Sequence, residues 1–376
     1  MEEINEKMHL QLLDFNSTKR KQWIEQRKPF SVLFELTSSC NMKCIHCYLQ
    51  NYHESNYLSY QEIIKIIDIL YVHGIIFLTF TGGEIFTRKD FLGIYMYAKR
   101  KGFLVELFTN ATLITDEIID VLKEYPPLLV DVSLYGDNEN TYTDITQVKG
   151  MFSKVVMNCK KMVDAGIRVS LKSPILQQTI GEIDGMKAIA KKIGVPFVFS
   201  FDITPTIDKS NKPRDYQVEL GTSLKYEFQN YYEQVSKGER KLGKLDENEI
   251  EKLAKCNYVY ACNVAQNSFI IDYKGNICPC MKLRHKGVSL LENDFDRIWD
   301  SFKYYSNIVA QEKYKCKKCE SRYFCDICPA EMDLIYGDAQ IRPEGVCVPA
   351  QIRRKFYSGE ITFEEAIREA YSNEKK

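Results

Sequence analysis

The stretch that decides the predicted fold is Ser31-Val-Leu-Phe-Glu-Leu-Thr-Ser-Ser-Cys40-Asn-Met-Lys-Cys44-Ile-His-Cys47. Its first part, Ser31–Leu36, is an apolar run typical of a parallel strand that is buried on both faces. The cysteines follow at once, so they occupy a loop at the carboxyl end of that strand, where parallel α/β folds bind ligands. Three thiolates on one loop can hold three irons of a 4Fe–4S cluster and leave the fourth iron open.

Two other interpretations of this loop stay open at this point. A structural zinc ion usually takes four ligands, and His46 is the obvious nearby candidate for the fourth. Alternatively, the cysteines are small buried side chains without a metal.

Working outward, strand and helix patterns alternate six times between Ser31 and about Asp202. The expected strands are Ser31–Leu36, Ile75–Thr81, Leu104–Thr109, Leu129–Leu134, Arg168–Leu171 and Phe197–Phe201. The expected helices are Tyr60–Val72, Asp90–Arg100, Asp116–Glu124, Phe152–Ala165 and Ile183–Lys192, with Ser59 and Thr115 as caps of the first and third. Repeats of roughly 30 residues predict an α/β fold in which a parallel sheet curls into a partial (β/α)6 barrel. A doubly wound open sheet is the alternative, because periodicity does not separate the two.

Composition limits the classes of partner. The chain has 376 residues with 51 basic and 51 acidic side chains, so no net charge attracts nucleic acid or an anionic membrane. No apolar run approaches the length of a membrane span, and Met1–Leu10 lacks the apolar core of a signal peptide. We therefore expect a cytoplasmic protein. In that reducing compartment 13 clustered cysteines indicate metal ligands rather than disulfides.

The loop Cys40-x3-Cys44-x2-Cys47, placed after the first strand of a β/α repeat, resembles the radical SAM enzymes. The resemblance implies that these cysteines hold a 4Fe–4S cluster whose open iron is chelated by the amino and carboxylate groups of S-adenosylmethionine (SAM). It also implies that His46 lies against the adenine.

A second match to this family follows the second strand. In Thr81-Gly82-Gly83-Glu84 the two glycines would let backbone approach a ligand closely, and the resemblance places Glu84 near the methionyl ammonium. Asn110, after the third strand, and Ser133, at the end of the fourth, are further candidates for SAM contacts. Both residue types are also common in turns.

The remaining short-spaced cysteines lie near the carboxyl end, where Cys316-x2-Cys319 and Cys325-x2-Cys328 have the spacing of metal-ligand pairs. With Gly275-Asn-Ile-Cys278-Pro-Cys280, this region resembles the SPASM domain of many radical SAM enzymes, which holds two auxiliary 4Fe–4S clusters. Carried over residue by residue, the first auxiliary cluster takes Cys256, Cys262, Cys280 and Cys328. The second takes Cys316, Cys319, Cys325 and Cys347.

The chain departs from the SPASM pattern in two places. Three residues usually separate the cysteines that correspond to Cys325 and Cys328, where this chain has two, which puts Cys328 in doubt. Cys278 and Cys280 can face the same side of a strand, so Cys278 is an alternative ligand. Cys159 is expected in the core. One or two structural zinc sites are the alternative for the whole region.

The resemblance implies three 4Fe–4S clusters, SAM, and a flavodoxin- or ferredoxin-type reductant. Relatives with two auxiliary clusters mostly modify peptides or proteins, so we expect reductive SAM cleavage to a 5′-deoxyadenosyl radical and oxidation of a peptide, such as a thioether or carbon–carbon crosslink. Sulfatase maturases typically carry an aspartate soon after the cysteine equated with Cys280, whereas Met281-Lys-Leu-Arg284 follows here. A small metabolite such as a tetrapyrrole is the alternative substrate, and a non-catalytic iron–sulfur or zinc redox protein is the third hypothesis.

The expected organisation has five parts. They are an N-terminal extension (1–30), a radical SAM core (31–225), a linker with a helix (226–255), a SPASM domain (256–350) and a C-terminal helix (351–376). Only about 30 residues precede the first strand, whereas many peptide maturases carry a leader-binding domain there. Leader recognition is therefore expected from a separate protein or from the SPASM surface.

Overall fold

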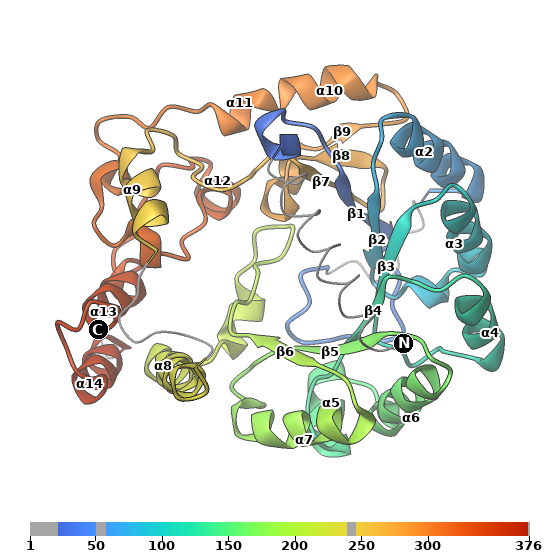
Figure 1. Cartoon of the computed structure of the whole chain (residues 1–376), viewed down its shortest axis with the longest axis horizontal. Helices are drawn as coiled ribbons and strands as arrows, with labels where there is room; N and C mark the ends of the chain where they lie inside the picture. The colour runs from blue at the N-terminus through green and yellow to red at the C-terminus, as the bar shows by residue number, and fades with distance from the viewer. Residues whose placement is uncertain (1–21, 50–57, 239–245, 375–376) are drawn as a thin grey trace.

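The computed structural model describes residues 22–49, 58–238 and 246–374 (Figure 1). Its centre is a run of six parallel strands that lie side by side in the order of the sequence. They are β1 (Ser31–Thr37), β2 (Phe77–Gly82), β3 (Leu104–Thr109), β4 (Leu129–Ser133), β5 (Val169–Pro174) and β6 (Phe197–Ser200). A doubly wound sheet reverses its strand order, and this one does not. The expected partial barrel is confirmed.

The helices between these strands form an outer layer around the curved sheet (Figure 1). They are α2 (Tyr60–Val72), α3 (Phe91–Arg100), α4 (Asp116–Glu124), α5 (Glu139–Thr146), α6 (Met151–Asp164) and α7 (Ile183–Ile193). Ser59 and Thr115 accept backbone hydrogen bonds at the starts of α2 and α4, as expected for N-caps. Val32, Phe34 and Leu36 of β1 are almost fully buried in the main hydrophobic core.

One helix, α5, is absent from the sequence prediction. Its sequence, Glu-Asn-Thr-Tyr-Thr-Asp-Ile-Thr, is rich in residues with modest helix propensity and shows little apolar periodicity. Its start is fixed instead by Asn138, whose side chain accepts hydrogen bonds from Asn140 and Thr141. This helix matters for function because its last turn holds the cysteine loop.

The cysteine-rich region extends the same sheet. Strand β7 (Ser268–Ile271) pairs in parallel with β1, and β8 (Asn276–Cys278) and β9 (Val288–Ser289) continue it as an antiparallel hairpin. The resulting nine-stranded sheet has the order β6-β5-β4-β3-β2-β1-β7-β8-β9. The first strand therefore lies between the barrel strands and the strands of the carboxyl-terminal region.

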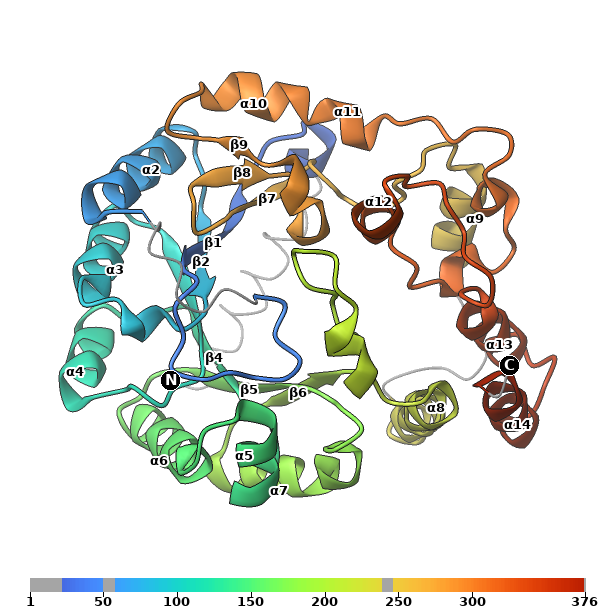
Figure 2. The same ribbon diagram turned by 180° about the vertical axis from the view of Figure 1, so that it is seen from behind.

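The remaining helices are α8 (Leu220–Ser236), α9 (Glu247–Lys255), α10 (Phe295–Ser301), α11 (Lys303–Ser306), α12 (Pro329–Tyr336), α13 (Val348–Tyr357) and α14 (Phe363–Glu374). Helices α8, α13 and α14 lie together (Figure 2) and share a separate small core. The expected boundary at residue 225 falls inside α8, and the one at residue 350 falls inside α13. Both helices pack through apolar side chains, so a division at these residues would cut a packed element. No helix in the described ranges combines the length and apolarity needed to cross a membrane.

Candidate functional site

The first three cysteines lie on the loop that follows β1. Cys40, Cys44 and Cys47 line one cavity of about 200 Å3 at the carboxyl end of the sheet. Burial is the main cause that raises the pKa of the Cys40 thiol to about 12 and that of Cys44 well above its ordinary value. Cys47 adds to both shifts, which places the three sulfurs within electrostatic reach of one another.

Helix α5 holds this loop by its carboxyl-terminal carbonyls. The amide of Lys43 donates to the carbonyl of Thr146, and the amide of Ile45 donates to that of Ile145, each at 3.0 Å. These carbonyls belong to the last turn of the helix, which has no internal donors left to satisfy them. The loop conformation is therefore set by an element 100 residues away that the sequence did not reveal.

The two glycines after β2 serve the same loop. A Cβ on Gly82 would lie 2.2 Å from the carbonyl oxygen of Thr37, and one on Gly83 would lie 2.3 Å from that of Ser39. Gly82 also has a φ of +140°. Both glycines line the cavity. We expected these glycines to let the backbone approach a ligand closely. In the structure they also pack closely against the backbone of Thr37 and Ser39, just before Cys40.

Glu84 is fully buried, and its carboxylate ties the ends of two strands together. Thr109 donates its hydroxyl to Oε1 at 2.7 Å, and the backbone amide of Asn110 donates to Oε2 at 2.6 Å. Burial raises the pKa of Glu84 to about 7, against the opposing effect of these hydrogen bonds. The residues lining the cavity include both glycines but not Glu84. In this structure its carboxylate lies behind the glycine turn.

Asn110 also supports the loop directly. Its side-chain amide donates to Oδ1 of Asn41 at 2.9 Å, and its own Oδ1 accepts from the backbone and hydroxyl of Thr112. Asn110 and Ser133 both line the cavity, as expected for the two candidate SAM contacts.

The imidazole of His46 faces the same space. Its Nδ1 is buried and has no hydrogen-bond partner among the described residues, while the ring packs edge-on against Tyr135 with centroids 4.9 Å apart. Burial lowers the pKa of His46 to about 4, so the ring is neutral at pH 7. A neutral ring with an orphaned polar atom fits contact with a bound ligand better than a solvated loop position.

Sequence reasoning missed several residues that line this cavity. Thr81 and Phe108 stand at the ends of β2 and β3, while Tyr48 and Tyr135 follow the cysteine loop and β4. The one sequence feature that could have identified them is their position at or just after strand ends. Their residue types are too common in protein cores to indicate a functional site.

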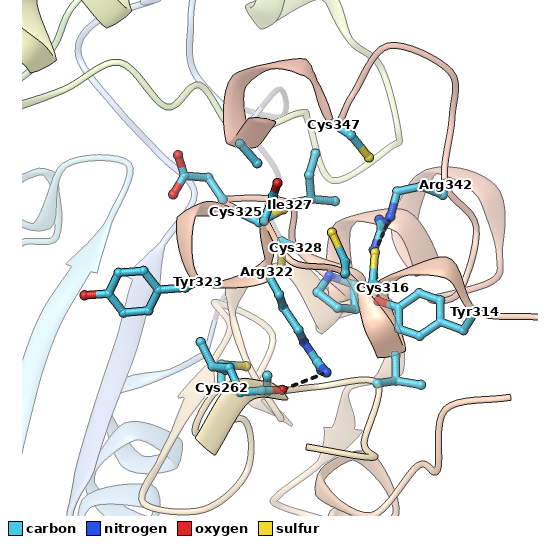
Figure 3. A pocket seen from close by; sticks show the side chains of 18 residues that line it. Cys262, Tyr314, Cys316, Arg322, Tyr323, Cys325, Ile327, Cys328, Arg342 and Cys347 are labelled. Atoms are coloured by element: carbon cyan, nitrogen blue, oxygen red, sulfur yellow. Dashed lines mark hydrogen bonds between the residues drawn. The ribbon is translucent and has the colours of Figure 1, made fainter. Parts of the chain in front are cut away.

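The carboxyl-terminal cysteines separate into two sets. In addition to burial, which is the main cause, Cys328 raises the pKa of Cys262 and Cys280. Cys316 has the same effect on Cys325 and Cys347, and Cys319 adds to the shift of Cys347. Members of both sets line a cavity of about 400 Å3 (Figure 3). Arg322, which lies between Cys319 and Cys325 of the second set, donates to the backbone carbonyl of Cys256 at 2.8 Å.

Burial, Asp272 and Cys280 all raise the pKa of the Cys278 thiol, so this cysteine lies within electrostatic reach of the first set. Its side chain is fully buried, with the sulfur against the carbonyl oxygens of Asn276 and Arg284 at 3.5 and 3.8 Å. A Cβ on Gly287 would lie 2.8 Å from this sulfur, so Cys278 fills the core of the β8–β9 hairpin. Cys159 is likewise buried in the main core, as expected.

All 13 cysteines are free, and the donors at the three sites are thiols. Soft thiolate ligands suit iron–sulfur clusters, so the chemistry of these donor sets fits that group. In the part of the chain that the structure describes, no three His, Cys, Asp or Glu side chains converge on a site for a single metal ion.

Comparison with known proteins agrees with this donor chemistry. Residues 34–190 match the sequence model of the Radical SAM superfamily. The chain carries a radical SAM domain. Residues 262–320 match the SPASM model, an iron–sulfur cluster-binding domain. The expected family is thereby confirmed, and with it a SAM-using enzyme that carries iron–sulfur clusters.

Two curated relatives point to different substrates. The antilisterial bacteriocin subtilosin biosynthesis protein AlbA of Bacillus subtilis is 28% identical over 255 residues, which is 67% of this chain and 55% of AlbA. The AdoMet-dependent heme synthase of Methanosarcina barkeri is 25% identical over 342 residues, covering 85% of this chain and 96% of the synthase. The chain thus spans only about half the length of AlbA.

Two solved structures share the fold. Streptococcus suis SuiB bound to precursor peptide SuiA has a TM-score of 0.67 at 14% identity, covering 88% of this chain and 80% of SuiB. The enzyme anSMEcpe with bound AdoMet and the Cp18Cys peptide has a TM-score of 0.63 at 18% identity, covering 92% and 99%.

Proposed function

We propose that this protein reductively cleaves SAM to a 5′-deoxyadenosyl radical and uses it to oxidise a peptide or protein. The observation that carries the proposal is that Cys40, Cys44 and Cys47 share one cavity with His46 and the Gly82–Gly83 turn. A 4Fe–4S cluster with an open iron, when bound there, supplies the electron for SAM cleavage.

The chain's own residues would position SAM around this cluster. The Gly82–Gly83 backbone borders the cavity beside the thiols, and the orphaned Nδ1 of His46 offers a polar contact on another side. Glu84 lies directly behind the glycine turn, where a carboxylate can balance the methionyl ammonium across a short distance. Phe108 and Tyr135 add aromatic surface to the lining of the cavity, which would limit the access of water to a reactive radical.

The two carboxyl-terminal thiol sets support two auxiliary clusters, which makes three clusters in all. We assign Cys256, Cys262, Cys280 and Cys328 to the first and Cys316, Cys319, Cys325 and Cys347 to the second. The separation of the thiols into these sets supports the assignment, including that of Cys328. These clusters would accept the electron that the oxidised substrate loses. The reductant for the SAM cluster would be a flavodoxin- or ferredoxin-type protein.

A cavity of mixed character beside the barrel can accommodate a peptide substrate. About 540 Å3 of space lies between the end of β6, helix α8 and the cysteine region, and both polar side chains such as Asp202 and Arg353 and apolar ones such as Phe201, Leu220 and Ile327 line it. Apolar walls with a few polar groups suit a peptide segment, whose side chains and backbone need both kinds of contact. Relatives such as AlbA and the mycofactocin maturase MftC favour the same substrate class.

A tetrapyrrole is the second candidate substrate. The specific observation in its favour is coverage, because the match to the heme synthase spans 96% of that enzyme. A match over nearly the whole length of a relative is more informative than one that covers about half of it, as the match to AlbA does.

The deciding experiment is anaerobic reconstitution with iron, sulfide, SAM and dithionite. We expect 5′-deoxyadenosine formation, and a mass loss of 2 Da per crosslink on a cysteine-containing precursor peptide encoded beside the gene. Unchanged peptide together with decarboxylation of a tetrapyrrole side chain would favour the second candidate. Absence of 5′-deoxyadenosine in a protein with a full iron content would contradict the proposal as a whole.

A further inference from the structure

Arg342 is the one described arginine whose guanidinium donates to a sulfur of the second thiol set. It lies on the loop between α12 and α13, and its Nε donates to Sγ of Cys316 at 2.7 Å. A second nitrogen of the same group also contacts this sulfur (Figure 3). Neither the family resemblance nor the cysteine spacing drew attention to this residue.

The guanidinium is held in place by further contacts. Its Nη2 donates to the hydroxyl of Tyr314 at 3.0 Å, its Nη1 donates to the carbonyl of Ile341 at 3.3 Å, and its Cζ lies 5.3 Å from the centre of the Tyr314 ring. A planar group fixed by several partners keeps its charge at a defined position, unlike a flexible lysine.

The charge of Arg342 reaches most of the second set. Besides its contact with Cys316, it lines the same cavity as Cys319, Cys325 and Cys347. The other arginine in this cavity, Arg322, is directed to backbone carbonyls of Cys256 and Tyr258, each at 2.8 Å. Its closest sulfur, that of Cys256, is 3.9 Å away.

A cation in this position has a predictable effect on a cluster. A 4Fe–4S cluster with four thiolates carries net negative charge, and one-electron reduction adds one more negative charge. A fixed guanidinium stabilises the reduced form more than the oxidised form, and hydrogen bonds to a ligand sulfur act in the same direction. The midpoint potential of the cluster therefore rises.

We propose that Arg342 is a positioning residue that raises the midpoint potential of the second auxiliary cluster. The inference rests on the proposed function, because it requires a cluster at Cys316, Cys319, Cys325 and Cys347. A higher potential makes this cluster the better acceptor of the electron that the substrate loses, and the transfer reduces it by one electron. Arg342 would thus direct electrons away from the barrel.

The test is a redox titration of the reconstituted full-length protein, followed by EPR spectroscopy. Arg342→Gln removes the positive charge and the paired hydrogen bonds that the guanidinium donates to Cys316. Arg342→Lys keeps the charge but lacks the planar guanidinium. The matched control is Lys318→Gln, which loses the same charge from the neighbouring segment η5 (Lys315–Lys318), where the lysine side chain is 82% exposed. Iron and sulfide contents are measured in every sample.

We expect Arg342→Gln to shift one auxiliary signal to a more negative potential, Arg342→Lys to shift it less, and Lys318→Gln to leave it unchanged. An unshifted potential in Arg342→Gln with full iron content would overturn the inference, as would loss of this cluster from both Arg342 variants. A parent protein that holds only one auxiliary cluster would instead contradict the cluster assignment itself, and the inference would fall with it.

Discussion

Glu35 of β1 and Arg284, four residues after Cys280, form an ion pair that is buried in the protein interior. Their side chains are 0% and 6% exposed. Tyr48, the residue after Cys47, donates its hydroxyl to the same Glu35 at 2.7 Å, and the Arg284 guanidinium lies over the Tyr48 ring. One carboxylate therefore connects the Cys40–Cys47 loop to the segment that follows Cys280. Burial lowers the pKa of Arg284 to about 9, which leaves it charged at pH 7.

The Glu35–Arg284 pair should be coupled, so that the effects of removing each partner on the free energy of unfolding do not add. Glu35→Gln or Arg284→Met leaves an unpaired buried charge, so we expect each to lower the free energy of unfolding by about 3–5 kcal/mol. The double variant should lose less than the sum, because no charge remains unpaired. Anaerobic urea denaturation measures all three. Lys160→Ala, which removes an exposed pair with Asp164, is the control and should change stability by less than about 1 kcal/mol. Additive losses would contradict the coupling.

Glu84 should give the apo-protein a specific pH dependence. Its folded pKa of about 7 lies above its ordinary value of 4.5, so the protonated carboxyl is favoured by folding. Its contribution to stability is fully present below pH 4.5 and is lost as the pH rises through about 7. At about 1.4 kcal/mol per pKa unit, the loss is of the order of 3 kcal/mol.

Glu84→Gln tests this dependence because the amide cannot ionise. We expect the parent to lose stability relative to the variant between pH 5 and pH 8 in urea denaturation, whatever constant offset the altered hydrogen bonds to Thr109 and Asn110 introduce. A constant difference across this range would show that Glu84 titrates normally. In the holoenzyme, the proposed pairing of Glu84 with the methionyl ammonium predicts that the same variant weakens SAM binding about 10- to 100-fold, since one charge-assisted contact is worth roughly 1.5–3 kcal/mol.

The barrel could be predicted from the sequence because its signals are local. Each strand is a short apolar run, and residues such as Ser59 mark helix starts directly. The pairing of β7 with β1 could not be predicted, because Ser31 and Ser268 become partners only in the folded sheet. Helix α5 was missed for a different reason, since its stability comes from a cap and from tertiary packing rather than from periodicity.

For the candidate site, too, local sequence signals could be read, whereas contacts between distant residues could not. Close cysteine spacing nominated the Cys40–Cys47 loop and the two pairs within Cys316–Cys328, whereas the division into two auxiliary clusters came from the SPASM resemblance. The supporting residues carry no such signal: Arg342 meets Cys316 across 26 residues, and Arg284 meets Glu35 across 249. Glu84 was expected near the methionyl ammonium, which stays a prediction, and its hydrogen bonds to Thr109 and Asn110 depend on how two strands end beside each other.

The cysteine loop after β1 should be separable from the auxiliary sites. Replacing Cys40, Cys44 and Cys47 with alanine should abolish 5′-deoxyadenosine formation while Mössbauer spectra still show the auxiliary clusters, because no other thiol set changes. Cys159→Ala is the matched control, since Cys159 is buried in α6 away from these loops. It should cost stability without loss of iron. Continued SAM cleavage by the triple variant would show that the catalytic cluster lies elsewhere.

Cys278 and Cys280 are two residues apart and should behave in opposite ways. Three clusters of four irons predict about 12 irons per reconstituted chain. Cys280 shares electrostatic contact with Cys262 and Cys328, so Cys280→Ala should lower the iron content by up to one cluster. The sulfur of Cys278 instead fills the hairpin core against Gly287. Cys278→Ala should therefore keep the iron content of the parent and lower the free energy of unfolding by about 1–2 kcal/mol through lost packing. Iron and acid-labile sulfide assays with urea denaturation measure both effects. Iron loss from Cys278→Ala with retention in Cys280→Ala would reverse the ligand assignment and make Cys278 the fourth thiol of the first auxiliary cluster.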